Sequence, residues 1–333
     1  MLSKKLFNLA QPVFKNIRYC SKVCIPYNEN NQNYTTNLDF VKDWNNIQTY
    51  RYFDLKGNVV ADRAKNLDYK ELNNVLYHML RLEIIDDILL KAQRQGRISF
   101  MMGSLGETAT TIGVSAGVKF TDIMMTQYRE QGCFYYRGYT IAQALNQCTG
   151  NRLCPAQGRQ MPHHYGDISL NMHFVSSPLA TQISHAAGAG YGFSLRNEDK
   201  ICVCWFGEGA ASEGDFFAGI NFGATLGSQT LYLARNNQYA ISTHYTDQMK
   251  SDGIAARGLG VGMKTLRVDG NDAVAVMQAT QFARDYIVKN KAPVLLEAMT
   301  YRVSDHSTSD HSILYRNQEE IDSWKDNNNQ ITR

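Results

Sequence analysis

The chain has 333 residues, of which 44% are hydrophobic and 20% are charged, a composition typical of folded globular proteins and too apolar for a mostly disordered chain. Its longest apolar stretches, such as residues 201–206, are far shorter than the roughly 20 residues of a membrane-spanning helix, so we expect no membrane span. The formal net charge is +3, but residues 29–333 carry 29 of the 34 basic and all 31 acidic side chains, and this near-neutral balance argues against a nucleic-acid-binding surface.

The first 28 residues differ from the rest of the chain in charge. They contain five basic residues and no acidic one, and apolar side chains recur at every third or fourth position from Leu2 to Ile17, although Pro12 interrupts this periodicity. An acid-free amphipathic start is typical of a mitochondrial presequence. We therefore expect residues 1–28 to be a presequence that directs the chain to the mitochondrial matrix, with Met1 as the start of translation. The polar, Asn-rich residues 29–50 are expected to form an N-terminal arm or linker.

Residues 51–325 are expected to form one domain. Residues 50–60 suggest a β-hairpin, and residues 68–92 a helix that Asp68 caps and Gly96 ends. Residues 107–118 are rich in Ala, Gly, Ser and Thr, which indicates a helix packed very close to a neighbour, and residues 182–193 repeat this composition. The segment 326–333 is expected to be a frayed polar tail.

The second half of the chain alternates between short apolar strands and helices. The expected strands are 201–206, 230–235, 265–268 and 294–301, and the expected helices are 212–226 and 272–289. This alternation predicts an α/β fold, a mostly parallel sheet with helices on both faces, and such sheets bind ligands at the carboxyl ends of their strands. None of the seven cysteines has CxxC spacing, so we expect reduced thiols, with Cys202 and Cys204 buried in the core.

A Gly-Glu-Gly sequence directly follows the first of these strands, and an Asn-Asn pair follows the next. Glu208 and Asn237 are thus one strand–helix–strand unit apart, which predicts a carboxylate and a carboxamide at the ends of two neighbouring strands. Mg²⁺ prefers such oxygen ligands, and the flanking glycines allow a diphosphate to approach the backbone. The pattern resembles the thiamine diphosphate motif, in which Asn-Asn follows Gly-Asp-Gly at a similar spacing, with Glu208 in the position of the usual Asp.

Further segments carry a resemblance to one family. They are Gln127–Glu130, Gly158–Gly166, Ser176–Gln182, Gly207–Asp215 and Tyr301–Asp310. Together they resemble the alpha subunit of the mitochondrial branched-chain 2-oxo acid dehydrogenase, and the similarity extends from Asp39 to Trp324. The pyruvate dehydrogenase alpha subunit is a related alternative, but residues 97–100 and 207–215 are closer to the branched-chain enzyme.

The resemblance implies a thiamine-diphosphate-binding fold and the oxidative decarboxylation of branched-chain 2-oxo acids. It also implies transfer of the acyl group to the lipoyl arm of an acyltransferase core, and a regulatory kinase. The glutamate that activates the cofactor would belong to a beta subunit, so the active site is expected between two chains of an α2β2 heterotetramer. A non-catalytic, alpha-like scaffold subunit is the alternative. The family continues beyond the position of Arg333, so the chain is expected to be a fragment or a truncated subunit.

The resemblance also assigns roles to matching positions. Magnesium would be held by Glu208, Asn237 and the carbonyl oxygen of Tyr239. The cofactor would contact Gln127, Tyr128, Arg129, Ser177, Leu179, Gly207, Gly209, Ala210, Arg235, Arg302 and His306, with Ser177 and Leu179 at its aminopyrimidine ring. A structural potassium ion would be held by Ser176, Pro178, Thr181 and Gln182. Planar guanidinium groups suit bidentate contact with phosphate, so the arginines agree with this assignment.

Two histidines and a serine complete the expected active site. His306 and His164 would be catalytic, because the pKa of imidazole lies close to neutral and suits proton transfer during acyl transfer. We expect Asp305 to raise the pKa of its neighbour His306. Ser307 is the expected phosphorylation site in a polar, accessible loop, where a phosphate would compete with the cofactor for Arg302.

Overall fold

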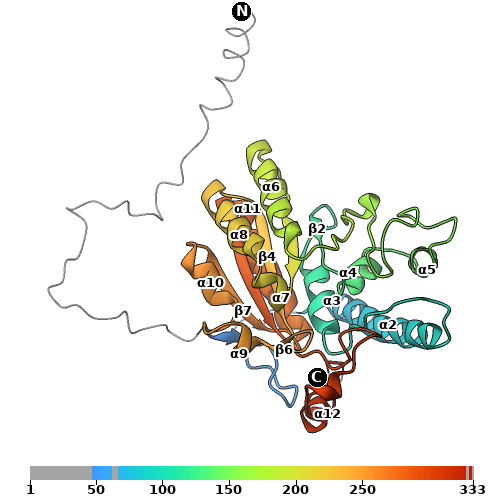
Figure 1. Ribbon diagram of the computed structural model, residues 1–333. Helices are drawn as coiled ribbons and strands as arrows, with labels where there is room; N and C mark the ends of the chain where they lie inside the picture. The colour runs from blue at the N-terminus through green and yellow to red at the C-terminus, as the bar shows by residue number, and fades with distance from the viewer. Residues whose placement is uncertain (1–46, 62–66, 328–329, 332–333) are drawn as a thin grey trace, which may run out of the picture. The chain divides into compact units, whose positions relative to one another are not determined.

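A six-stranded parallel sheet forms the centre of the fold (Figure 1). The computed structural model describes residues 47–61, 67–327 and 330–331, so the expected presequence and most of the expected arm lie outside the described residues. The strand order is β1-β7-β8-β4-β3-β2, and each neighbouring pair is parallel. The strands are β1 (Thr49–Tyr50), β2 (Ile123–Met125), β3 (Cys202–Phe206), β4 (Thr230–Asn236), β7 (Lys264–Asp269) and β8 (Val294–Met299). The predicted parallel α/β sheet is thus confirmed.

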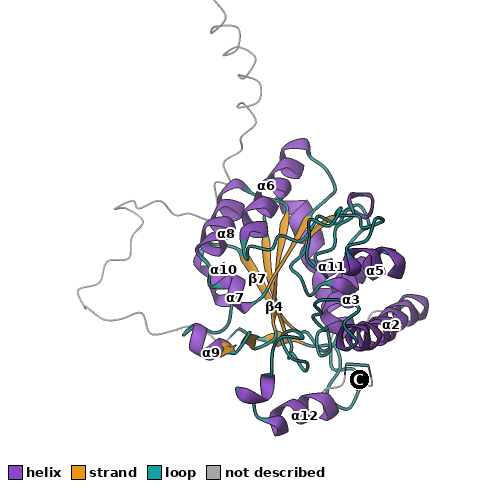
Figure 2. Ribbon diagram, turned by 45° about the vertical axis from the view of Figure 1, so that its right-hand side comes forward, coloured by secondary structure: helices purple, strands orange, loops and turns teal. Residues whose placement is uncertain are grey.

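Helices cover both faces of this sheet (Figure 2). One face carries α11 (Ala273–Asn290) and α3 (Thr108–Gly117), outside which α2 (Tyr69–Arg94) and α4 (Gln131–Tyr136) pack; the other carries α6 (Thr181–Arg196), α8 (Gly214–Leu226) and α10 (Ala255–Gly260). The remaining elements are α5 (Ile141–Thr149), α7 (Glu208–Ala211), α9 (Tyr245–Gln248), α12 (Gln318–Asn327), the 3₁₀ helices η2 (Ile168–Leu170) and η3 (Ser312–Leu314), and a hairpin of β5 (Tyr239–Ala240) and β6 (Thr243–His244). Within the described ranges, no helix is both long and apolar enough to cross a membrane.

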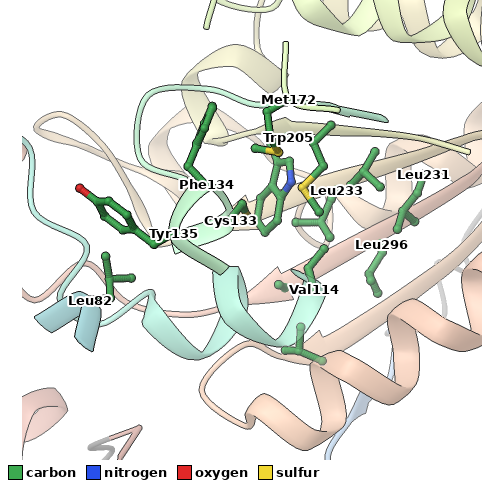
Figure 3. Close-up of a cluster of buried hydrophobic side chains, with 14 of the residues drawn as sticks. Leu82, Val114, Cys133, Phe134, Tyr135, Met172, Trp205, Leu231, Leu233 and Leu296 are labelled. Atoms are coloured by element: carbon green, nitrogen blue, oxygen red, sulfur yellow. The ribbon is translucent and has the colours of Figure 1, made fainter. Parts of the chain in front are cut away.

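The strands contribute to a separate hydrophobic core on each face of the sheet. Successive side chains of a strand point to opposite faces, and in β3 Val203 and Trp205 join the core beneath α11 and α3, whereas Cys202, Cys204 and Phe206 join the core beneath α6 and α8. All five side chains are fully buried, and Figure 3 shows Trp205 among its neighbours in the first core. The two cysteines are free thiols, as predicted.

Local sequence signals begin and end the longer helices where we expect them. The Asp68 carboxylate accepts a hydrogen bond from the backbone N–H of Lys70 at the start of α2, and Gly96 follows the helix at a φ of +72°. The Asp272 carboxylate caps α11 in the same way through Ala275. Such caps stabilise a helix by about 1 kcal/mol each, and the two helices agree with the predicted ranges 68–92 and 272–289.

The helices rich in small residues pack very close to their neighbours, as predicted. A Cβ atom on Gly117 of α3 would lie only 2.6 Å from the Cβ of Thr280 on α11, and one on Gly219 of α8 would lie 2.7 Å from the Cγ2 of Ile183 on α6. Side-chain carbon atoms do not approach so closely without displacement, so glycine at these positions sets the distance between the helices.

The expected hairpin at residues 50–60 is present but shorter than predicted. Tyr50 belongs to β1, the edge strand that pairs with β7, whereas Phe53 and Val59 form an antiparallel bridge. The N–H of Val60 donates to the carbonyl oxygen of Tyr52, and the N–H of Asp54 donates to the carbonyl oxygen of Asn58, around the predicted turn. The backbone N–H groups of Tyr52 and Phe53 donate to the Asp272 carboxylate at the start of α11, which anchors the hairpin to that helix.

The predicted helix 212–226 is confirmed as α8, which begins two residues later because Glu213 is extended, with a ψ of 154°. The expectation for the tail needs correction. The expected frayed tail contains Gln330, whose Nε2 donates to Oδ1 of Asn271 and whose Oε1 accepts from the N–H of Ala109. This residue of the tail is thus held by hydrogen bonds at the start of α3.

Candidate functional site

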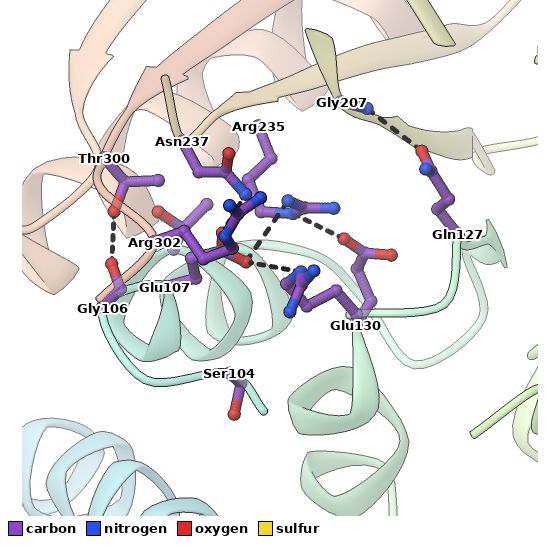
Figure 4. Close-up of polar contacts among 12 residues, drawn as sticks. Ser104, Gly106, Glu107, Gln127, Glu130, Gly207, Arg235, Asn237, Thr300 and Arg302 are labelled. Atoms are coloured by element: carbon purple, nitrogen blue, oxygen red, sulfur yellow. Dashed lines mark hydrogen bonds and ion pairs between the residues drawn. The ribbon is translucent and has the colours of Figure 1, made fainter. Parts of the chain in front are cut away.

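The carboxyl ends of four neighbouring strands bring the predicted site residues to one edge of the sheet (Figure 4). Gln127–Arg129 follow β2, Glu208 follows β3, Asn237 follows β4, and Arg302 comes shortly after β8. Because β3 and β4 are hydrogen-bonded neighbours, the expectation that Glu208 and Asn237 lie at the ends of adjacent strands is confirmed.

Three arginines are buried at this edge, and two of them pair with buried carboxylates. Arg129, Arg235 and Arg302 are each no more than 2% exposed. Arg235 places Nε 2.8 Å from Oε1 of Glu130 and Nη1 3.2 Å from Oε2 of Glu107, and the Nε of Arg129 lies 3.5 Å from the same Glu107 oxygen. Charges buried in this way must be paired, so the two carboxylates hold the guanidinium groups in place.

Arg302 is surrounded by neutral oxygen atoms. It donates to the carbonyl oxygens of Tyr239 and Ile241 and to the hydroxyl of Tyr315. Burial lowers its pKa, and the positive charge of Arg129 lowers it further. A cation held by dipoles alone is well suited to pair with an anion that enters from solution.

Glu107 and Glu130 are the functional residues that the sequence analysis missed. Glu107 lies 130 positions from its partner Asn237 in sequence, and Glu130 lies 105 positions from Arg235. The available signal was a lone acidic residue in each of two apolar segments, one opening the small-residue helix and one following Arg129. Such a residue must find a buried partner, but the sequence does not identify which one.

Glu208 is a buried carboxylate at the carboxyl end of β3. It is 2% exposed, and its Oε1 has no hydrogen-bond partner among the described residues. Burial raises the pKa of Glu208 to about 7, and the nearby Arg235 opposes this shift. A buried carboxylate oxygen without a partner is costly, and a divalent cation would remove that cost.

The other two predicted magnesium ligands, Asn237 and Tyr239, already take part in hydrogen bonds within the chain. Asn237 donates its Nδ2–H to Glu107, and its Oδ1 accepts from the backbone N–H of Tyr239 at 3.2 Å. The carbonyl oxygen of Tyr239 accepts from Arg302. No cluster of three or more His, Cys, Asp or Glu side chains able to hold a metal occurs in the part of the chain that the structure describes. A carboxylate, an amide oxygen and a carbonyl oxygen fit Mg²⁺ that is completed by phosphate oxygens and water.

Hydrogen-bond and ring contacts connect Gln127 and Tyr128 to other predicted site residues. The Gln127 side chain accepts from the N–H of Gly207 at 3.1 Å, which ties the end of β2 to the end of β3. The ring of Tyr128 lies 6.4 Å from that of His164 and 5.8 Å from that of His306, measured between ring centroids. Gly209 and Ala210 lie in the single turn of α7, and Ser177 and Leu179 lie in the exposed segment before α6.

The electrostatic surroundings of His306 differ from the expected ones. Its Nδ1 lies 3.2 Å from a guanidinium nitrogen of Arg129 and 3.4 Å from one of Arg302, and since guanidinium only donates, Nδ1 is the acceptor. Burial and these two positive charges lower the pKa of His306 to about 3. The expectation that Asp305 raises this pKa is wrong, because its carboxylate accepts hydrogen bonds from the backbone N–H and hydroxyl of Ser312 instead.

His164 is buried beside the same site. It is 4% exposed, its Nδ1 lies 3.1 Å from the carbonyl oxygen of Pro162, and burial lowers its pKa. The adjacent His163 is buried even more completely, and both of its ring nitrogens lack partners among the described residues. His164, however, is the one whose ring lies near Tyr128.

Three of the four predicted potassium ligands, Ser176, Pro178 and Thr181, contact one another at the start of α6. The hydroxyl oxygens of Ser176 and Thr181 lie 2.7 Å apart, and the Thr181 hydroxyl donates to the carbonyl oxygen of Pro178. Gln182 donates its Nε2–H to the carbonyl oxygen of Trp205, while its buried Oε1 has no partner in the described part of the chain. These oxygen atoms are suitable ligands for a monovalent cation.

Ser307 is less accessible than expected. It is 9% exposed, and its hydroxyl oxygen accepts from the N–H of Ser309. The loop is held by a hydrogen bond from the N–H of Thr308 to the carbonyl oxygen of Met101 and by one from the hydroxyl of Tyr315 to the Asp310 carboxylate. The prediction of an accessible loop is therefore wrong for Ser307, although Ser309 is exposed.

Comparison with known proteins defines the class of this chain. The family model described as "Dehydrogenase E1 component" matches residues 77–333, and the chain belongs to that family. The family membership agrees with the parallel sheet flanked by helices.

The names of individual relatives are more specific than the description of the family. The chain is 47% identical to the 2-oxoisovalerate dehydrogenase subunit alpha, mitochondrial, of Dictyostelium discoideum over 307 residues, which cover 92% of this chain and 70% of the relative. It is 46% and 45% identical to the proteins of the same name from Mus musculus and Homo sapiens, each over 288 residues that cover 86% of this chain and 65% of the relative. The chain thus spans about two thirds of the length of the relatives it matches.

Proposed function

We propose that this chain is the alpha subunit of a thiamine-diphosphate-dependent dehydrogenase that decarboxylates branched-chain 2-oxo acids. Its family and the names of its relatives support the activity and favour branched-chain substrates over pyruvate. The observation that carries the proposal is the buried Glu208, whose free oxygen lies at a sheet edge shared with Asn237 and three buried arginines. A scaffold subunit would have no need of such costly buried charges.

The residues of the site divide into groups by the part of the cofactor they suit. Glu208, Asn237 and the carbonyl oxygen of Tyr239 would hold Mg²⁺. The diphosphate would be held by Gln127, Tyr128, Arg129, Arg235 and Arg302 with the backbone of Gly207, Gly209 and Ala210, and the aminopyrimidine by Ser177 and Leu179. Ser176, Pro178, Thr181 and Gln182 would hold K⁺. When bound, the cofactor supplies the carbanion chemistry that releases carbon dioxide from a 2-oxo acid.

The two histidines near Tyr128 are the proposed catalytic residues of this chain. His306 accepts from Arg129 and Arg302 at Nδ1, so its neutral ring carries the proton on Nε2. A diphosphate at these arginines would offset their charge and raise the pKa of His306, which would allow Nε2 to exchange a proton during acyl transfer. The ring of His164 also lies near that of Tyr128, and His164 would line the same space.

The proposal also covers the proteins that would bind this chain and its location in the cell. The glutamate that activates the cofactor would come from a beta subunit in an α2β2 heterotetramer, and the acyl group would pass to a lipoylated acyltransferase core. The relatives' names include the word mitochondrial, which supports a matrix location and a presequence at residues 1–28. We further propose Ser307 as the target of a regulatory kinase. Because Ser307 is buried, the kinase would need the loop to open.

Assembly with a beta subunit tests this proposal. The chain, coexpressed with the beta subunit of the same source, should retain thiamine diphosphate and decarboxylate 3-methyl-2-oxobutanoate with a higher kcat/KM than pyruvate. The chain without a beta subunit should be inactive with both acids. A preference for pyruvate would overturn the substrate class, and activity of the isolated chain would overturn the shared active site.

A further inference from the structure

Glu107 is a buried carboxylate whose two oxygen atoms face different parts of the candidate site. Its side chain is fully buried. Oε1 accepts a hydrogen bond from Nδ2 of Asn237, and Oε2 lies 3.2 Å from Nη1 of Arg235 and 3.5 Å from Nε of Arg129. One side chain therefore joins a candidate metal ligand to two candidate phosphate ligands, as Figure 4 shows for Asn237 and Arg235.

This contact determines which way the Asn237 carboxamide faces. A carboxylate only accepts hydrogen bonds, so the NH₂ group of Asn237 must face Glu107 and Oδ1 must point away from it. Oδ1 accepts from the backbone N–H of Tyr239. An amide oxygen has two acceptor positions, so one position of Oδ1 remains for a cation.

We propose that Glu107 is a positioning residue of the divalent-metal site, which holds the Asn237 carboxamide with its oxygen turned toward the cation. The inference rests on the proposed function, in which Asn237 ligates Mg²⁺. Groups that orient a metal ligand in this way typically contribute ten- to a hundredfold, roughly, to metal affinity. Because the same carboxylate pairs with Arg235, it also competes with a diphosphate for that arginine.

The variant Glu107→Gln, in the complex with the beta subunit, separates these two effects. A glutamine presents both an NH₂ group and an oxygen to Asn237, so the carboxamide is free to turn over. We expect the affinity for Mn²⁺, measured by electron paramagnetic resonance with thiamine diphosphate present, to fall at least about tenfold. The affinity for inorganic pyrophosphate without metal, measured by calorimetry, should stay equal or increase. A general loosening of the site would weaken both.

Three further variants serve as controls. Glu213→Gln removes an exposed carboxylate near the site and keeps the pair of Glu107 and Asn237, so Mn²⁺ affinity should stay near the wild-type value. Asn237→Asp alone places two carboxylates face to face and should abolish Mn²⁺ binding. The double variant Glu107→Gln/Asn237→Asp restores one donor and one acceptor in exchanged positions and should recover most of the Mn²⁺ affinity.

Each result of these experiments supports or contradicts the positioning role of Glu107. Wild-type Mn²⁺ affinity in Glu107→Gln, or a double variant no better than Asn237→Asp, would overturn the positioning role. If Glu107→Gln does not fold, the comparison of the double variant with Asn237→Asp tests the positioning role instead. A wild-type complex that binds neither thiamine diphosphate nor Mn²⁺ would instead overturn the proposed function, and the inference with it.

Discussion

Single residues at the sheet edge hold charges that are costly to bury. Removing an arginine from water costs several kcal/mol, roughly, unless a partner compensates, and Arg129 and Arg302 are each 1% exposed. Glu107 and Glu130 compensate Arg235 and part of Arg129, whereas Arg302 relies on carbonyl and hydroxyl oxygens. The uncompensated positive charge explains both the suitability of this edge for a diphosphate and the low pKa of the neighbouring His306.

The protonation of His306 gives the first prediction. Its pKa is lowered from 6.5 to about 3 by burial and by Arg129 and Arg302, so the ring should be neutral at pH 7 without an anion. Since the unfolded chain then binds a proton first as the pH falls, His306 should reduce the free energy of unfolding progressively from pH 6.5 down to about pH 3. Histidine NMR titration, assigned with His306→Asn, measures this pKa, and inorganic pyrophosphate should raise it. A pKa near 6.5 in the absence of anion would contradict the account.

The sequence predicted the position of a site residue correctly where a motif places that residue directly after a strand. The positions of Glu208 and Asn237 follow from their spacing, because adjacent parallel strands end at the same edge. The roles of Glu107 and Glu130 could not be predicted, since their partners lie more than a hundred positions away. The pKa of His306 was predicted with the wrong sign. Asp305, its neighbour in sequence, accepts from Ser312 instead, while Arg129 reaches His306 from the end of β2 and Arg302 from four residues earlier in the same segment.

At the scale of structural elements, the loop after β8 contains Ser307, the proposed phosphorylation site, and gives the second prediction. Ser307→Glu, in the complex with the beta subunit, should remove most of the overall activity, because a charge at this buried position would displace the loop and draw Arg302 away from the diphosphate. Ser309→Glu is the matched control, since Ser309 is exposed in the same loop and should keep near-wild-type activity. Acyl transfer to a lipoylated acceptor measures both variants, and equal rates for the two would exclude this mechanism.

The close contact of α3 with α11 gives a prediction about stability. Gly117→Leu would force side-chain atoms into Thr280 and the carbonyl oxygen of Met277, and overpacking of this kind costs roughly 1–3 kcal/mol. Gly188→Ala on α6 is the control, because its new Cβ meets no atom within 4 Å, and alanine favours the helix by about 1 kcal/mol. Thermal unfolding should show a lower Tm for Gly117→Leu only; an unchanged Tm would mean that the helices can move apart freely.

Elements were predicted well wherever their signal is local. Apolar runs of strand length, capping residues and clusters of small residues identified β3, β4, α2, α3, α6 and α11. The edge strand β1 was misread as part of a hairpin, because its pairing of Thr49 with Arg267 joins segments that are remote in sequence. Non-local pairing leaves no pattern in either segment alone.

At the scale of the whole molecule, the candidate site depends on four of the six strands of the sheet. Its side chains extend from Gln127 to Arg302 and follow four different strands, so a bound cofactor would connect distant parts of the chain. Leu179, expected at the aminopyrimidine, is 36% exposed, which agrees with a site that a second subunit completes. A ligand that binds only the assembled sheet should also stabilise it, by about 2.7 kcal/mol at a hundred times its Kd.

Calorimetry of thiamine diphosphate binding to the complex with the beta subunit, with and without Mg²⁺, tests the central claim most directly. The wild type and Glu213→Gln, an exposed neighbour in the same segment, should bind tightly and only with Mg²⁺. Glu208→Gln should weaken binding at least about tenfold, or about 1.4 kcal/mol, because the only charged metal ligand proposed for this chain is lost. Unchanged affinity in Glu208→Gln, or wild-type binding that needs no divalent ion, would contradict the assignment of this sheet edge as the cofactor site.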